Sequence, residues 1–381
     1  MLCVCQVIPE LSAGGAERTT VDVAAGLAAR GDRALVASQG GRLADELAAH
    51  GGSLIEGPYA SKNPVTILRN AGRLTKLAKA ENVQVLHARS RAPAWSAREA
   101  AKRAGVAFVT TYHGIYNAQS GLKRRYNAIM ASGDVVIANS EYTKAHILEE
   151  HEIEAERVVV IPRGVDFAVF DPNAIAPERV EAMRAGWGLA PDFDGPVLLL
   201  PARLTRWKGH LWAIEALARI TQSPAPVLVC AGDPQGREDY VAEVRAAAQT
   251  AGLGDQVKVV GHATDMPAAY AASDIVLTPS LEPEAFGRTA VEAQAMGKPV
   301  IAADHGAARE TVRHNATGVL VRPGDTRALT SALKGLLARG PGGRRTMGRA
   351  GRAYTKAHFT VEAMVTATLE VYARVRHETR R

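Results

Sequence analysis

TPSLEPEAFGRTAVEAQAMGKPV, residues 278–300, places a loop with a carboxylate directly before a helix. The loop follows an apolar run, Asp274–Thr278, which predicts a strand that ends there. Residues 288–296 suit a helix, and a glycine and a proline end it. Gly287 permits the backbone to approach a ligand closely. A helix N-terminus attracts phosphate, whereas the carboxylate of Glu284 accepts hydrogen bonds from hydroxyls. The segment therefore predicts a ligand with a phosphate at one end and a sugar at the other.

Two glutamates of this segment, Glu284 and Glu292, stand eight residues apart. Their spacing and their flanks, PEAFG and EAQAMGKPVIA, resemble the E-x7-E signature of the retaining GT-B glycosyltransferases of family 4. The resemblance implies that Glu284 orients the transferred sugar and that Glu292 binds the ribose. It further implies donor contacts, through backbone amides above all, from Phe286, Gly287, Arg288 and Thr289. Taken alone, two glutamates at this spacing are also typical of an acidic loop and a solvated helix face.

A basic pair follows another predicted strand, residues 197–200. Arg203-Leu-Thr-Arg-Trp-Lys208 resembles the R-x4-K motif of the same family. A nucleoside diphosphate leaving group gains negative charge, which fixed cations stabilise. Arginine grips two oxygens at once, and lysine supplies a point charge. Such a pair replaces Mg²⁺, and no D-x-D follows a predicted strand, so we expect no metal ion and no cofactor. Arg206 is a weaker candidate, and solvated cations are the alternative interpretation.

A glycine-containing loop, Ser12-Ala-Gly-Gly-Ala-Glu-Arg18, connects the first predicted strand and helix. Gly14 and Gly15 permit positive φ and close backbone approach. The loop is not G-x-G-x-x-G, and no acid follows at the spacing of a nicotinamide-dinucleotide site, which argues against a dehydrogenase. It resembles the GGxE-type loop of family 4, which implies that Gly15 lies near the donor phosphate or the acceptor. A purely structural turn is the alternative.

Two further motifs of the first half follow predicted strands. His113 comes after residues 108–112, and ligands of open α/β sheets gather at the carboxyl ends of strands. The resemblance implies that His113 lies near the transferred sugar; a structural histidine is the alternative. Ile161-Pro-Arg-Gly-Val-Asp166 resembles the family's IPNGVD, with Arg163 in place of the usual asparagine. This replacement adds a charge near the expected cleft.

Strands and helices alternate along both halves of the chain, which predicts an α/β fold with parallel sheets. With the family resemblance, we expect the GT-B architecture: two Rossmann-like, doubly wound parallel-sheet domains that face each other across a cleft. Residues 1–166 form the expected acceptor-side domain, 167–195 a proline-containing connection, and 196–358 the nucleotide-sugar-binding domain. We expect the terminal helix, 359–375, to pack back on the first domain. Residues 339–352 are rich in glycine and arginine.

Length and composition agree with two globular domains. The chain has 381 residues, of which 47% are apolar, and no apolar run reaches the roughly 18 residues of a membrane-spanning helix. The N-terminal MLCVCQVIPEL lacks the features of a signal peptide and predicts a buried strand. Cys3, Cys5 and Cys230 show no disulfide or metal-binding spacing, so we expect buried thiols in a reducing cytoplasm.

Basic residues concentrate between Ala60 and Arg125. Thirteen Lys or Arg accompany two acids there, Glu81 and Glu99, a local excess of +11 in a chain whose net charge is +7. This excess predicts an anionic partner, either an acidic acceptor or the inner face of the cell membrane. Solvated helix faces are the alternative. Aromatic residues make up only 5% and do not interleave with the basic ones, which argues against nucleic acid.

Together these features predict a retaining, metal-independent hexosyltransferase. We expect a UDP- or GDP-sugar as donor and a glycan or glycolipid hydroxyl as acceptor, in bacterial lipopolysaccharide or surface polysaccharide synthesis. The expected catalytic residues are Glu284, His113, Arg203 and Lys208. In the front-face mechanism that the resemblance implies, no enzymic nucleophile is required. The alternatives are a nucleotide-sugar epimerase of the same fold and a non-catalytic nucleotide-sugar binder.

Overall fold

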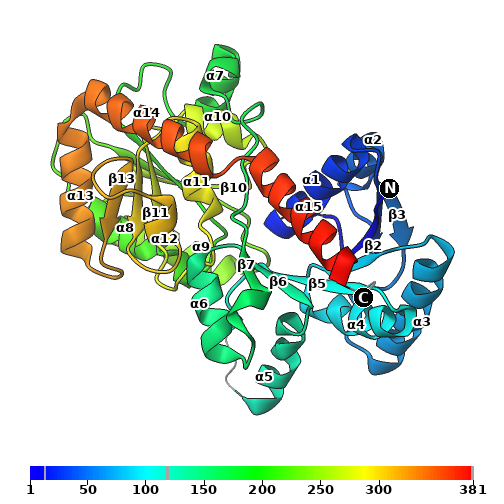
Figure 1. Cartoon of the computed structure of the whole chain (residues 1–381). Coiled ribbons are helices and arrows are strands. Elements are labelled where there is room, and N and C mark those ends of the chain that lie inside the picture. Colours follow the sequence, from blue (N-terminus) through cyan, green and yellow to red (C-terminus); the bar gives the residue numbers. More distant parts are fainter. Residues whose placement is uncertain (13, 117–119, 379–381) are drawn as a thin grey trace. The chain divides into compact units, whose positions relative to one another are not determined.

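The computed structural model describes residues 1–12, 14–116 and 120–378. The chain divides into two compact units (Figure 1). The first unit comprises Met1–Gly164 and the C-terminal helix that begins at Val361, and the second comprises Val165–Thr360. Each unit is a parallel sheet with helices between its strands, so the predicted α/β architecture with two doubly wound parallel sheets is confirmed.

The first unit has a seven-stranded sheet in the order β3-β2-β1-β4-β5-β6-β7, and its neighbouring strands are parallel. The strands are β1 (Cys3–Val7), β2 (Arg33–Ser38), β3 (Ser53–Glu56), β4 (Val85–Ala88), β5 (Ala107–Tyr112), β6 (Val135–Ala138) and β7 (Val158–Val160). The strand order reverses between β1 and β4, where Val4 pairs with Val85. Ligands of such sheets bind beyond the carboxyl ends of the strands at this reversal.

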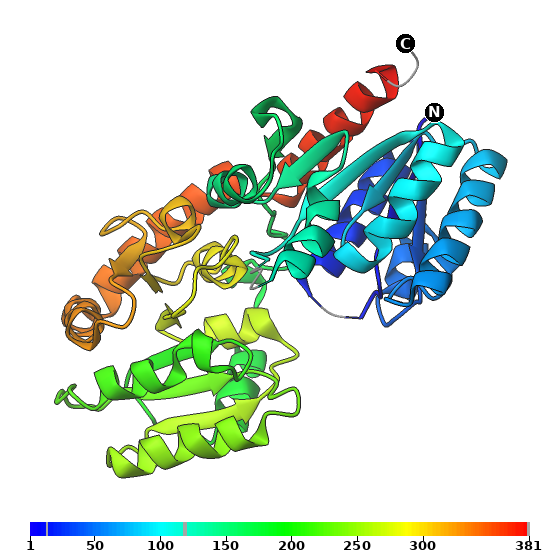
Figure 2. The same ribbon diagram turned by 90° about the horizontal axis from the view of Figure 1, so that it is seen from below.

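Helices cover both faces of this sheet, as the blue and cyan elements of Figure 2 show. They are α1 (Gly15–Ala29), α2 (Ala44–Ala49), α3 (Pro64–Ala80), α4 (Arg91–Ala104), α5 (Gly121–Asn127), α6 (Glu141–Glu150) and α15 (Val361–Glu378), with 3₁₀ turns η1 (Ala128–Ala131) and η2 (Ala155–Arg157). Strand β1 alternates between the two cores: Cys3 and Cys5 face the core of α3 and α4, whereas Val4 faces that of α1 and α15. The three cysteines of the chain are buried and free, as predicted.

The second unit has a six-stranded parallel sheet in the order β10-β9-β8-β11-β12-β13. Its strands are β8 (Val197–Pro201), β9 (Val227–Ala231), β10 (Val257–Gly261), β11 (Ile275–Thr278), β12 (Val300–Ala303) and β13 (Gly318–Val321). Its helices are α7 (Pro177–Gly186), α8 (His210–Leu217), α9 (Glu238–Thr250), α10 (Met266–Ala271), α11 (Arg288–Ala295), α12 (Ala308–Thr311), α13 (Thr326–Ala338) and α14 (Gly340–His358), with 3₁₀ turns η3 (Pro172–Ala174) and η4 (Arg206–Lys208). Here the strand order reverses between β8 and β11.

Residues 167–195 differ from the expected connection. They belong to the second unit, which begins at Val165, and they contain η3 and α7. Trp187 and Leu189 are buried in the same core as strand β8, because α7 packs on α10 and brings them there. Two of the three prolines of this segment begin helical turns instead of interrupting them, since Pro172 and Pro177 stand at first-turn positions.

Residues 339–352, which are rich in glycine and arginine, form most of the helix α14. Its glycines permit close packing: a Cβ on Gly348 would overlap the carbonyl oxygen of Gly297 at the end of α11. The buried guanidinium of Arg344 pairs with Asp274 at 3.1 Å. Tertiary contacts thus outweigh the low helix propensity of glycine.

Candidate active site

The loops that follow β8 and β11 carry the predicted donor residues of the second unit. The two strands are neighbours, with Ile275 opposite Leu198, and the strand order reverses at this point. Because both strands are parallel, the loops emerge at the same sheet edge. The fold therefore brings the R-x4-K segment next to the E-x7-E segment, although about 80 residues separate them in the sequence.

Gly209 fixes the approach of these two loops. Its φ is +77°, and a Cβ on it would overlap the carbonyl oxygen of Pro279. The amide of Leu281 donates to the carbonyl of Trp207 at 2.6 Å. Backbone packing thus places Lys208, which lies between these contacts, beside the glutamate loop.

Glu284 and Lys208 form the ion pair at the centre of this site. Lys208 Nζ lies 2.8 Å from Glu284 Oε1, and the two side chains are only 14% and 23% exposed. The hydroxyl of Ser280 donates to the same oxygen. Burial opposes ionisation of Glu284, but Lys208, Ser280 and His305 outweigh it and hold the pKa of this carboxyl below its usual value. Among the residues that the structure describes, Oε2 of Glu284 has no hydrogen-bond partner.

The loop after β12 holds the backbone of Glu284. Ala307 donates to its carbonyl oxygen at 3.0 Å, and a Cβ on Gly306 would clash with its backbone. His305 Nε2 lies 2.8 Å from the carbonyl oxygen of Ser280. A small cavity of about 20 Å³ lies beside Glu284 and Gly287. The carboxylate is therefore held by three loops, those after β8, β11 and β12.

Gly287 is the N-cap of α11 and has a left-handed backbone, with φ 81° and ψ 50°. This conformation suits glycine and turns the loop into the helix. Phe286 is only 5% exposed and packs edge-on against Phe359, with ring centroids 5.6 Å apart. Its side chain belongs to the core, so any ligand contact of Phe286 is through its backbone.

Glu292 is 8% exposed and both of its oxygens are engaged. Arg288 Nε donates to Oε1 at 2.5 Å, and the hydroxyl of Tyr270 donates to Oε2 at 3.0 Å. The pKa of Tyr270 is raised by burial, by the negative charge of Glu292 and by the hydrogen bond to Glu292. The charge of Arg288 and a hydrogen bond with Thr289 oppose this shift. The second glutamate is therefore part of a polar cluster formed by α10 and α11.

Arg203, the other predicted phosphate-binding cation, is exposed. Its guanidinium has no ion-pair or hydrogen-bond partner in the described part of the chain. Arg206 instead pairs with Glu243 and lies over the ring of Tyr240, with its Cζ 5.2 Å from the centroid. These partners explain why Arg206 is the weaker candidate.

In the first unit, the loop after β1 leads into α1. Gly14 is the N-cap and has φ +141°, whereas Gly15 is the first helical residue and does not have the positive φ expected for both glycines. A Cβ on Gly14 would clash with the carboxylate of Glu17. Burial raises the pKa of Glu17, and the charge of Arg163 opposes this shift. Ala13 of the predicted loop lies outside the described residues.

His113 follows β5 and contacts Arg163 from the loop after β7. Arg163 Nη2 lies 3.0 Å from His113 Nδ1 and 3.2 Å from the carbonyl oxygen of His113. Burial, then the charges of Arg163 and Arg89, hold the pKa of His113 well below its usual value. His113 is therefore a neutral imidazole near pH 7.

Three residues at these positions were not predicted from the sequence: Ser280, His305 and Tyr270. Ser280 lies within the quoted segment, and a hydroxyl four residues before Glu284 was an available signal. His305 follows β12, so its place after a strand was a second signal. Tyr270 ends a helix and gives no local signal, because only the packing of α10 against α11 brings it to Glu292.

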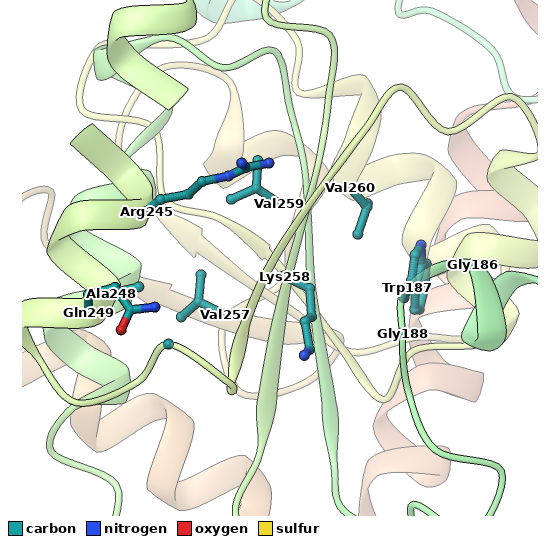
Figure 3. A pocket seen from close by; sticks show the side chains of 11 residues that line it. Gly186, Trp187, Gly188, Arg245, Ala248, Gln249, Val257, Lys258, Val259 and Val260 are labelled. Carbon is teal, nitrogen blue, oxygen red and sulfur yellow. The ribbon is translucent and has the colours of Figure 1, made fainter. Parts of the chain in front are cut away.

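A larger pocket lies elsewhere in the second unit, along the edge strand β10. It has a volume of about 450 Å³. Figure 3 shows Arg245 and Gln249 of α9 on one side of the strand and Trp187 on the other. None of the predicted site residues lines it, so its size alone does not mark it as the active site.

Comparison with known proteins identifies the family of the chain. Residues 13–169 match the family described as Glycosyltransferase Family 4, and residues 188–354 match Glycosyl transferases group 1. A solved glycosyltransferase from Rickettsia africae ESF-5 is 36% identical, with a TM-score of 0.89 and 98% of each chain covered. The chain belongs to glycosyltransferase family 4. Its two parallel-sheet units fit the GT-B fold of its structural neighbours.

Two further relatives bear on the ligand. Anabaena Alr3699/HepE, solved in complex with UDP and glucose, is 26% identical, with a TM-score of 0.84, and covers 98% of this chain and 100% of its own. The D-inositol 3-phosphate glycosyltransferase of Jonesia denitrificans is 34% identical over 255 residues. That match covers 65% of this chain, and the chain spans about 58% of the relative's length.

Proposed function

We propose that the protein transfers a sugar, with retention of configuration and without a metal ion, from a nucleotide diphosphate sugar to an acceptor hydroxyl. The observation that carries this proposal is the Lys208–Glu284 pair where the strand order of the second sheet reverses. It places a cation for a diphosphate beside an ionised carboxylate for sugar hydroxyls. Oε2 of Glu284 accepts the hydroxyls, since Lys208 and Ser280 both donate to Oε1.

The donor contacts divide by chemistry. Lys208 and the exposed Arg203 stabilise the charge that develops on the diphosphate. The N-terminal amides of α11, next to Gly287, contact phosphate or sugar, and Arg288 and Thr289 stand in that first turn. Glu292 accepts the ribose hydroxyls while Arg288 and Tyr270 hold it.

The proposed reaction needs no enzymic nucleophile. The bond from the anomeric carbon to the phosphate oxygen breaks, and the bond to the acceptor oxygen forms on the same face of the sugar. The acceptor proton passes to the departing phosphate oxygen. Gly15 and His113, which follow strands of the first sheet, are proposed as the substrate contacts of the first unit.

Thermal unfolding with nucleotides in EDTA tests the donor site. UDP, GDP, ADP and CMP, each with its common sugars, are compared at saturating concentration. A ligand at a hundred times its Kd stabilises a protein by about 2.7 kcal/mol, which such a scan detects. Because HepE was solved with UDP, UDP is the first nucleotide to be tested. Binding of one diphosphate without metal, lost in Lys208→Ala, supports the proposal; binding that requires Mg²⁺ contradicts metal independence.

The acceptor is proposed to be a hydroxyl of an anionic glycan or glycolipid, of the lipopolysaccharide or surface polysaccharide type. The names of the curated relatives offer inositol phosphate as the second candidate. Radiolabelled donor, once identified, is incubated with each acceptor class and with none. Label in lipid-extractable glycan supports a glycan or glycolipid acceptor. Label in inositol phosphate contradicts it and identifies inositol phosphate as the acceptor. Conversion of the donor with no acceptor present would favour a nucleotide-sugar epimerase instead.

We further propose that α3, α4 and α5 form a basic surface that contacts anionic lipid. Eleven of the thirteen basic side chains between residues 60 and 125 are exposed; Arg89 and Arg91 are the exceptions. The same surface exposes Val65, Leu68 and Leu122 and contains an apolar groove of about 450 Å³, beside Trp95 and Tyr126. Cations beside exposed apolar side chains suit an anionic bilayer surface. No helix of the described chain is both long and apolar enough to span a bilayer.

A further inference from the structure

Arg163 and His113 meet at the carboxyl edge of the first sheet. His113 comes directly after β5 and Arg163 lies beyond β7, two strands away. One nitrogen of the guanidinium, Nη2, reaches both Nδ1 of the imidazole, at 3.0 Å, and the carbonyl oxygen of His113, at 3.2 Å. The arginine thus holds both the ring and the backbone of the histidine.

This contact decides which ring nitrogen carries the proton. A guanidinium has only N–H donors, so Nδ1 of His113 must accept. A neutral imidazole has one acceptor nitrogen and one donor nitrogen, and the proton therefore lies on Nε2. Asparagine, the usual residue of this family motif, has both a donor and an acceptor on its amide. Asparagine would therefore accommodate either tautomer, whereas arginine accommodates one.

The groups around His113 disfavour its charged form. Arg163 approaches from the loop after β7, and the buried Arg89 lies after β4, where it donates to Gln6 at 2.9 Å. His87 on β4 hydrogen-bonds to Thr111 at 2.7 Å and to Tyr372 at 2.5 Å. The side chain of Tyr116 forms a hydrogen bond with the backbone of His113. Burial raises the pKa of Glu17, and the charge of Arg163 also acts on this carboxyl by opposing the rise.

The other ring nitrogen, Nε2, indicates a ligand contact because the described residues of the protein supply no acceptor for it. Nε2 of His113 is buried and has no hydrogen-bond partner within residues 1–12, 14–116 and 120–378. A buried N–H donor without an acceptor is unfavourable, and such groups in native proteins need an explanation. A hydroxyl oxygen of a bound sugar supplies the missing acceptor.

We propose that Arg163 is a positioning residue that keeps Nδ1 of His113 as an acceptor and Nε2 as a donor, so that His113 donates a hydrogen bond to a substrate hydroxyl. This role rests on the proposed glycosyl transfer. It adds to it a specific task for the arginine that stands where the family motif has asparagine. Arg163 itself acts through His113 and does not touch the reacting atoms.

Nitrogen NMR of the full-length protein with ¹⁵N-labelled histidine tests the tautomer directly. The signals of His113 are assigned from their loss in His113→Gln. We expect the Nε2–H tautomer in the wild type, with an imidazole pKa well below the usual histidine value. Arg163→Lys, which retains a donor-only group, keeps this tautomer. Arg163→Asn gives a mixture of tautomers and a titration nearer the usual range.

The matched control is Arg157→Asn. Arg157 lies in the same unit and donates to the backbone carbonyls of Gly133 and Asp134, away from His113. This variant leaves the His113 signals unchanged. The proposal is overturned if the wild type has the Nδ1–H tautomer. It is also overturned if His113 in Arg163→Asn has the same tautomer and the same titration as in the wild type. Should Arg163→Asn fail to fold, Arg163→Gln takes its place in the same comparison.

Kinetics supply the second readout. We expect Arg163→Asn to lower kcat about tenfold, while the donor KM changes little because the diphosphate contacts lie in the second unit. Arg163→Lys recovers most of the loss, and in the pH profile of Arg163→Asn the ionisation of His113 moves to higher pH than in the wild type, because one of the charges that lower its pKa is gone. An unchanged kcat in a variant with altered tautomer contradicts the role in turnover. The NMR result does not depend on transfer activity, so failure of the proposed function is distinguishable from failure of this inference.

Discussion

Lys208 has a structural partner in the second unit and, in the proposed reaction, a catalytic task as well. Its ammonium neutralises the partly buried Glu284 and, in the proposed reaction, the diphosphate as well. These two tasks are compatible because lysine has three donors and a flexible stem. Trp207 contributes a further contact, since Nζ of Lys208 lies 4.1 Å from its ring centroid.

Replacement of this residue, Lys208→Ala, is expected to lower kcat/KM at least about a hundredfold, because a preorganised charge at the leaving group is lost. It leaves Glu284 partly buried without its cation, so the free energy of unfolding falls by about 1–3 kcal/mol. Steady-state kinetics and urea denaturation measure the two effects. Arg206→Ala is the control, since Arg206 is 70% exposed and pairs with Glu243. Equal losses in both variants would contradict the assignment.

Glu284 predicts a pH dependence of stability. Its pKa is lower in the folded chain than in the unfolded chain, where a glutamate titrates at about 4.3. Its stabilising contribution is therefore present above the unfolded pKa and is lost as the pH falls through the folded pKa. We expect the stability difference between the wild type and Glu284→Gln to be largest near neutral pH and to shrink below about pH 4. Urea denaturation of both proteins across this range measures it; a difference that grows on acidification would refute the sign.

At the scale of elements, loops that follow strands carry the proposed chemistry, and their glycines determine how closely the backbones approach. Gly209 brings the loop after β8 against Pro279, and Gly306 brings the loop after β12 against Glu284. Helix α14 uses the same principle outside the site, where Gly348 packs against Gly297. Each of these positions lacks room for a methyl group.

Two glycines of α14 allow a direct test of close packing. Gly348→Ala is expected to destabilise the protein by about 2–3 kcal/mol, because its Cβ would overlap the carbonyl oxygen of Gly297. Gly342→Ala lies in the same helix with no atom within 4 Å of the added Cβ. It is expected to stabilise by about 0.5 kcal/mol through helix propensity. Thermal and urea unfolding measure both. Similar effects of the two substitutions would show that α14 does not need this contact.

At the scale of the whole molecule, the distribution of charge matters more than its sum. The net charge of +7 is smaller than the +11 excess of residues 60–125 alone, so the rest of the chain carries a net negative charge. The first unit therefore presents the attractive surface to an anionic partner.

Vesicles of phosphatidylglycerol test this surface by cosedimentation. Binding is expected to weaken steeply between low salt and about 0.5 M NaCl, because screening shortens the range of the charges. Substitution of Lys123, Arg124 and Arg125 by glutamine is expected to weaken it about tenfold or more, since each charge near the surface contributes about 1 kcal/mol. Arg327, Lys334 and Arg339 of the second unit, replaced together, form the charge-matched control. Binding that is absent, insensitive to salt or equally weakened by both sets would contradict a lipid-binding role for this surface.

The sequence by itself determined the fold class and most element positions. Periodicity and turn residues predict helices over 65–80, 92–104, 141–150, 238–251 and 326–337. The helices α3, α4, α6, α9 and α13 match these ranges within one residue, because they follow local patterns of apolar residues. The sequence also predicted that the candidate donor residues lie in loops after strands, and the structure has Arg203, Lys208 and Glu284 in the loops after β8 and β11. Local patterns did not predict α14 or α7, because their stability comes from contacts with α11 and α10.

Only the tertiary structure decided how the predicted residues pair. Lys208 pairs with Glu284, Tyr270 hydrogen-bonds to Glu292, and Arg163 contacts His113. None of the long-range pairs follows from spacing in the chain, because strand order, and not sequence order, determines which loops are neighbours. The chemical types of the site residues are local properties of the sequence, whereas their protonation states depend on burial and on neighbours that the fold supplies.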